Sequence, residues 1–116
     1  MADLYIIHGW TYTVEPWKNT LEILRENGIT VKMLNVPGLT EPSKKVYTID
    51  DYVKWANQEI PDGAIALGHS NGGRILLNLC AKKPKKTTYC TLRVNIYMQP
   101  GWVWLDDVEI IPLEKK

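Results

Sequence analysis

The chain has 116 residues, of which 45% are hydrophobic and 23% are charged, and its formal net charge is +1. This length suits one small domain, and the near balance of charge excludes a strong general attraction to nucleic acid or to an anionic membrane. No apolar run approaches the ~18–20 residues that a membrane-spanning helix needs, and the N-terminus lacks the features of a secretory signal. We therefore expect a cytoplasmic protein with no nucleic-acid or membrane partner.

The first third of the chain predicts a strand, a helix and a second strand. The run Leu4–Ile7 is short and wholly apolar, which is typical of a strand buried on both faces of a parallel sheet. Pro16 opens a helical pattern that Gly28 ends, which is the expected order of these two residue types around a helix. Residues 29–36 alternate between apolar and polar side chains and predict the next strand.

The middle of the chain continues this alternation of helices and strands. Residues 37–47 contain two prolines and no apolar periodicity, so they predict a loop. Thr48, followed three residues later by Asp51, resembles the capping box that begins a helix. The apolar run 64–67 predicts a third strand, and residues 73–83 predict a third helix. Strands that alternate with helices indicate an α/β fold, a three-layer α/β/α structure with a short, mostly parallel sheet.

The last thirty residues have a different pattern. From Cys90 to Met98 every second residue is apolar, which is typical of an antiparallel strand with one face in solvent. The Gln-Pro-Gly sequence at 99–101 suits a tight turn before a second strand. We therefore expect an α/β body in residues 1–86 and a C-terminal β-hairpin in residues 87–116 that packs on the sheet or extends it.

A G-x-S-x-G pattern, Gly68-His69-Ser70-Asn71-Gly72, lies between the third predicted strand and the third predicted helix. A serine in a sharp turn between a strand and a helix presents its Oγ at the carboxyl edge of the sheet. Glycines are expected on both sides because such a turn leaves little room for side chains. The N–H of Asn71, at the helix N-terminus, would then point toward an oxyanion that forms at the serine. The pattern makes Ser70 a candidate nucleophile.

Residues 3–84 resemble the α/β-hydrolase superfamily. The resemblance rests on three stretches in the family's order: LYIIHGW, LNVPGLTEPSKKVYTIDDYVKWANQEI and AIALGHSNGGRILL. The family's usual Asp-x-Pro-Gly appears here as Asn-Val-Pro-Gly at residues 35–38. The resemblance implies a truncated α/β-hydrolase fold with a C-terminal hairpin added. It also implies a serine hydrolase of the esterase class that acts on a small ester or amide without a cofactor or a metal.

The resemblance also assigns roles to single residues. It implies that Ser70 is the nucleophile and that the N–H groups of Asn71 and Trp10 form the oxyanion hole. Trp10 follows His8 and Gly9, so these two residues are expected near the site. In the family, the position of His8 serves the structure of this loop.

The chain departs from the family where the acid and the catalytic histidine are expected. In the family these two residues follow the serine, but His8 and His69, the two histidines of this chain, both precede Ser70. The side chain of His69 is expected near the site but pointing away from Ser70 Oγ, and His8 stays open as an improvised base. Asp106 and Asp107 follow Ser70, and without a histidine between them they favour an exposed hairpin edge.

Residues 90–112 carry a weaker resemblance, to the closing strands of β-sandwich carbohydrate-binding modules, through the run GWVWLDDV. Trp102 and Trp104 share one strand face there, where they would either stack on sugar rings or cover the end of the α/β sheet. The chain thus combines part of one fold with a piece of another. A natural truncation, a chimera and a fragment that works with a partner all stay open.

The sequence therefore predicts a serine-hydrolase-like protein with its nucleophile at Ser70 and no recognisable base. A serine hydroxyl is a weak nucleophile without an adjacent base, and general base catalysis contributes ~10²–10⁴-fold, so we expect weak activity or none from this chain alone. Two alternatives stay open. One is a non-catalytic structural, ligand-binding or carbohydrate-binding module, and the other is half of an active site completed in trans. An open sheet edge would also allow a homodimer.

Overall fold

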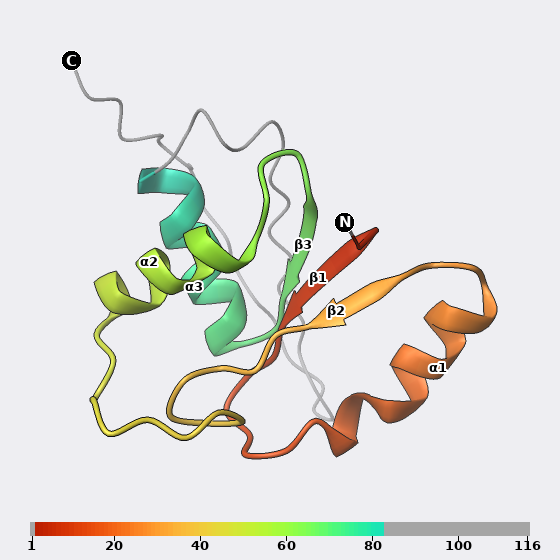
Figure 1. The fold of residues 1–116 in the computed structure, drawn as a ribbon, viewed down its shortest axis with the longest axis horizontal. Coiled ribbons are helices and arrows are strands. Elements are labelled where there is room, and N and C mark those ends of the chain that lie inside the picture. Colours follow the sequence, from red (N-terminus) through yellow and green to blue (C-terminus); the bar gives the residue numbers. More distant parts are fainter. Residues whose placement is uncertain (1, 83–116) are drawn as a thin grey trace, which may run out of the picture.

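The computed structural model describes residues 2–82, which form a layered α/β structure (Figure 1). Along the chain the elements are β1 (Leu4–Ile7), one turn of 3₁₀ helix (Glu15–Trp17), α1 (Lys18–Glu26), β2 (Val31–Met33), α2 (Ile49–Glu59), β3 (Ile65–Gly68) and α3 (Asn71–Lys82). The predicted α/β fold class is confirmed. The predicted C-terminal hairpin, with Trp102, Trp104, Asp106 and Asp107, lies outside the described residues. Within residues 2–82, every helix is too short or too polar to cross a bilayer.

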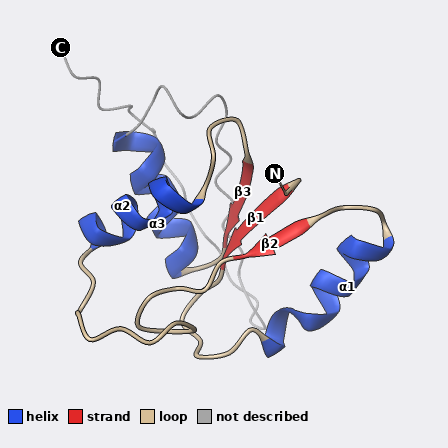
Figure 2. Cartoon of the chain, in the orientation of Figure 1, coloured by secondary structure: helices blue, strands red, loops and turns tan. Residues whose placement is uncertain are grey.

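The three strands form a parallel sheet in the order β2-β1-β3 (Figure 2). The central strand β1 pairs in register with both neighbours. β1 has the predicted bounds, whereas β2 is shorter than the strand predicted over residues 29–36. That alternation included the buried Leu34 and Val36, which follow β2 in irregular backbone and enter the core from there.

Helices α2 and α3 cover one face of the sheet, and α1 lies on the other side (Figure 1). Tyr5 and Ile7 of β1 belong to the main hydrophobic core, which lies between the sheet and α2 and α3. The other buried members of this core are Leu34, Val36, Leu39, Tyr52, Val53, Ala56, Ile60, Ile75 and Leu79. The apolar sides of α2 and α3 therefore face the sheet.

Within residues 2–82, the opposite face of the sheet is covered at Ile6 of β1, which is 1% exposed, but not over β3. No residue of α1 is buried, and its apolar Leu21 and Leu24 are only partly covered. On the same face, Ile65 and Leu67 of β3 are 69% and 42% exposed. Apolar surface on a sheet is ordinarily covered by another layer. Within residues 2–82, α2 and α3 therefore cover their face of the sheet more completely than α1 covers the other.

The turn from β3 into α3 packs backbone against backbone. A Cβ added to Gly68 would lie 2.5 Å from the carbonyl oxygen of Gly72, and a Cβ added to Gly72 would overlap the carbonyl of Ile7. Glycine is required at both positions because of this close approach, and neither of them has a positive φ. The first turn of α3 is therefore held directly against the end of β1.

We predict that Gly72→Ala destabilises the protein by about 3 kcal/mol or more, because the added methyl group must displace the backbone of the central strand. Gly73→Ala is the matched control, since a Cβ there would lie 3.2 Å from the nearest atom, the Gly68 carbonyl oxygen. Alanine also favours the helix over glycine by about 1 kcal/mol. Urea unfolding of both variants checks this. Equal stability of the two variants would contradict the close approach of Gly72 to the Ile7 carbonyl.

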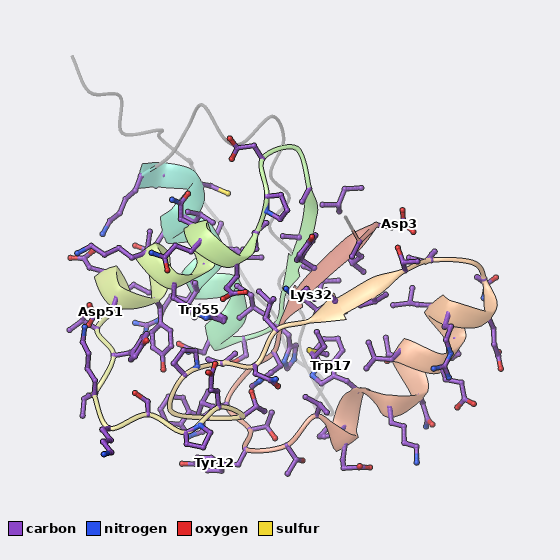
Figure 3. The ribbon with its side chains drawn as sticks, in the orientation of Figure 1. Asp3, Tyr12, Trp17, Lys32, Asp51 and Trp55 are labelled. Carbon is purple, nitrogen blue, oxygen red and sulfur yellow. The ribbon has the colours of Figure 1, made fainter. Side chains whose placement is uncertain are left out.

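A capping box begins α2, as the Thr48-x-x-Asp51 spacing predicted. The Thr48 hydroxyl accepts the N–H of Asp51 at 3.2 Å, and the Asp51 carboxylate accepts the N–H of Thr48 at 3.0 Å. Lys45 Nζ donates to the same carboxylate at 2.8 Å, and Figure 3 shows Asp51 at the start of this helix. The hydrogen bond from Lys45 and then those from Thr48 lower the pKa of Asp51 from 3.8 to about 2.

We predict that Asp51→Asn lowers the free energy of unfolding at neutral pH and that this loss disappears in acid. The carboxyl pKa is lower in the folded state, so ionised Asp51 stabilises the fold above its unfolded pKa of 3.8, and the effect is lost as the pH falls through about 2. Urea unfolding measured from neutral pH downward checks the trend. Glu22→Gln, an exposed charge removal on α1, is the control and should show no such convergence with wild type.

Candidate active site

Ser70 lies in the two-residue bend between β3 and α3. Its φ is +54°, and it is the one non-glycine residue among residues 2–82 with a positive φ. A residue with a side chain is strained in this left-handed region by roughly 1–2 kcal/mol, and such strain gathers at functional turns. Ser70 is also exposed. The structure thus places Ser70 at the end of the sheet, in the bend that the G-x-S-x-G pattern predicts.

The segment that follows β1 lies directly beside Ser70. A Cβ added to Gly9 would lie 3.0 Å from Ser70 Cβ and 3.0 Å from His69 Nδ1, so Gly9 is in van der Waals contact with the bend. The N–H of His69 donates to the carbonyl of Ile7 at 3.1 Å, which ties the two segments together. Gly9 and Ser70, two residues that the sequence assigned to one site, are therefore neighbours.

Two backbone N–H groups flank this contact. The N–H of Asn71 belongs to the first residue of α3, and the N–H of Trp10 belongs to the residue after Gly9. Within residues 2–82, neither group donates to an acceptor, and the Ser70 hydroxyl has no hydrogen-bond partner there. The N-terminus of α3 adds the positive end of the helix dipole. A hydroxyl beside two unused N–H groups is an arrangement that suits a carbonyl substrate.

His8 is buried, with 1% of its surface exposed, and both of its ring nitrogens have partners. Nδ1 lies 2.7 Å from the Gly9 carbonyl oxygen, and Nε2 lies 2.7 Å from the Thr40 hydroxyl. No ring nitrogen is left to accept the Ser70 proton, so the role as an improvised base has no support and a structural role fits. Thr40 was not predicted from the sequence, because the Asn-Val-Pro-Gly pattern at residues 35–38 ends before it.

His69 is exposed, and its ring meets Trp17 edge-on, with 5.8 Å between the ring centroids and 78° between the planes. Figure 3 shows Trp17 beside the carboxyl ends of the strands, where α1 begins. Trp17 therefore packs on the residue that precedes Ser70. Neither histidine of residues 2–82 forms a hydrogen bond with Ser70.

Two other kinds of site could occur on the described surface, a metal site and a pocket. Within residues 2–82, no group of three or more His, Cys, Asp or Glu side chains could hold a metal ion. A shallow hollow lies elsewhere, along the start of α2, where Lys45, Tyr47 and Trp55 are among its lining residues. Ser70 does not line it.

Comparisons with known proteins agree with the α/β fold. A family model described as alpha/beta hydrolase fold matches residues 4–111. The chain is 25% identical over 84 residues to the biotin biosynthesis bifunctional protein BioHC of Cellvibrio japonicus. This alignment covers 72% of this chain and 16% of that protein. The chain is 28% identical over 90 residues to a pimeloyl-[acyl-carrier protein] methyl ester esterase of Aromatoleum aromaticum, covering 78% and 36%. No solved structure shows a significant match.

This chain therefore spans well under half the length of the two relatives. The family match nevertheless covers most of the chain, from β1 through α3 and beyond. It includes the parallel sheet and the strand–bend–helix segment that carries Ser70. The chain belongs to the alpha/beta hydrolase family.

Proposed function

We propose that this chain carries the nucleophile and the oxyanion donors of a carboxylic-ester hydrolase. Ser70 Oγ attacks the carbonyl carbon of the ester, and the N–H groups of Asn71 and Trp10 donate to the oxyanion that forms. The observation that supports this most is the positive φ of Ser70 in the β3–α3 bend, with Gly9 packed against it. Each oxyanion donor is worth roughly 10²–10³-fold in rate when removed from such enzymes.

The substrate class rests on the relatives and on the local surface. One relative is named as a methyl ester esterase, which favours an ester with a small alcohol as its leaving group. Trp10 and Tyr12, in the segment after Gly9, are 70% and 67% exposed. They offer apolar surface to the acyl part of such an ester.

The described residues provide no group to accept the proton that Ser70 loses when it attacks. Attack breaks the Ser70 O–H bond, and the proton must pass to a base and then to the departing alcohol, before water hydrolyses the acyl-serine. His8 has both ring nitrogens occupied, His69 packs on Trp17, and the sequence contains no third histidine. We infer that the base comes from outside residues 1–116 and that these residues alone react slowly.

We predict that a fluorophosphonate probe labels Ser70 slowly and that added imidazole accelerates the labelling by acting as the base in solution. Ser70→Ala should abolish the labelling. Ser43→Ala, the replacement of the only other serine in the chain, should leave it unchanged. Mass spectrometry of the labelled peptide, with time courses at several imidazole concentrations, measures both effects.

A second candidate, a ligand-binding module without turnover, is favoured by the lack of an imidazole partner for Ser70 within the described residues. It predicts that Ser70 is not labelled at any imidazole concentration, while a non-hydrolysable ester analogue still binds. That pair of results would overturn the hydrolase proposal. Labelling that depends on Ser70 would instead exclude the binding-only function.

A further inference from the structure

A chain of three hydrogen bonds lies behind Gly9 and joins two loops that are far apart in the sequence. The N–H of Val36 donates to Thr40 Oγ1 at 2.7 Å. Thr40 Oγ1 lies 2.7 Å from His8 Nε2, and His8 Nδ1 lies 2.7 Å from the Gly9 carbonyl oxygen. His8 and Val36 are fully buried. A polar group of theirs that lost its hydrogen bond would therefore be left without a partner in the interior.

The direction of every bond in this chain follows from its two ends. The Gly9 carbonyl only accepts, so His8 Nδ1 must carry a proton and donate. In a neutral ring Nε2 then has a lone pair, which must accept from the Thr40 hydroxyl. The backbone N–H of Val36 only donates, so Thr40 Oγ1 accepts from it. The Thr40 hydroxyl proton is then donated to His8 Nε2. The Gly9 carbonyl therefore requires the Nδ1–H tautomer of His8, and the Thr40 hydroxyl stabilises this tautomer by donating to the lone pair of Nε2.

The position of Thr40 is itself fixed by its loop. The N–H of Leu39 and the N–H of Glu41 both donate to the Val36 carbonyl, at 3.0 and 3.1 Å, and the N–H of Gly38 donates to the Glu41 carbonyl at 2.7 Å. The Tyr52 hydroxyl of α2 donates to the Pro37 carbonyl at 2.8 Å. The Thr40 hydroxyl is thus held on a tight turn that is anchored to the core helix.

At the other end, the Gly9 carbonyl accepts two hydrogen bonds, from His8 Nδ1 and from the N–H of Thr11 at 2.9 Å. The carbonyl and the following N–H belong to one planar trans peptide, in which they point in opposite directions. Holding the Gly9 carbonyl therefore fixes the direction of the Trp10 N–H. This N–H is the group that the proposed function assigns to the oxyanion.

We propose that Thr40 is a positioning residue for the oxyanion hole. Its hydroxyl holds His8 in the Nδ1–H tautomer, His8 holds the Gly9 carbonyl, and the Gly9–Trp10 peptide then keeps its N–H aimed at the substrate oxyanion. This inference rests on the proposed function for its catalytic consequence. The tautomer and the geometry of the hydrogen bonds do not depend on it.

The tautomer is tested on the wild-type protein by a long-range proton–nitrogen NMR spectrum of the His8 ring. We expect Nδ1 to appear protonated and Nε2 to appear as an acceptor. Thr40→Val, which keeps the side-chain shape and removes the hydroxyl, should change the Nε2 signal or convert the ring to the other tautomer. Thr40→Ser should retain the wild-type spectrum. A wild-type ring protonated at Nε2 alone would overturn the proposal, whatever the activity.

The catalytic consequence is tested by the rate at which a fluorophosphonate labels Ser70. We expect Thr40→Val to slow the labelling about tenfold, less than the outright loss of an oxyanion donor costs, and Thr40→Ser to restore it. An unchanged rate in Thr40→Val, in a chain that does label at Ser70, would overturn the positioning role. Absence of labelling in the wild type would refute the proposed function and leave the NMR result to decide the role of Thr40 in the loop.

Discussion

The contact between the first turn of α3 and the end of β1 is the constraint on which the site depends. Gly72 leaves no space for a side chain against the Ile7 carbonyl, so the chain must turn from β3 into α3 within two residues. The left-handed φ of Ser70 closes this bend. The same approach brings Gly9 against Ser70. The exposure of the hydroxyl, its strained backbone and its neighbouring N–H groups are thus consequences of how two backbones pack.

The parts of the structure that local chemistry determines could be predicted from the sequence. The bend at Ser70, the capping box of α2 and the limits of β1 each depend on residues within a few positions of one another. Thr40 could not be predicted, because its contact with His8 spans 32 residues and no local pattern marks it. The exposure of α1 could not be predicted either. Periodicity shows which side of a helix is apolar, but not whether another layer covers it.

His8 shows how a histidine close in sequence to a candidate site can have a structural role instead of accepting a proton. His8 precedes Gly9, which packs against Ser70, and the sequence left His8 open as an improvised base. Its ring is instead part of a path of hydrogen bonds that runs from Tyr52 on α2, through the turn that carries Thr40, to the Gly9 carbonyl. The packing of the core and the geometry at the sheet edge are therefore coupled. A change in how α2 docks would be transmitted to the Gly9–Trp10 peptide.

Within residues 2–82 no strand pairs with the outer edge of β3, and this edge has a consequence for how the site can be completed. With α2 on one face, the chain passes from β2 across β1 to β3, and α3 follows on that same face (Figure 2). Right-handed crossovers then carry any returning parallel strand further in the same direction, to the unpaired side of β3. The carboxyl ends of parallel strands share one rim. A further parallel strand paired with β3, from this polypeptide or from a second molecule, would end at the same edge of the sheet as Ser70. The residue that follows such a strand could then serve as the proton acceptor.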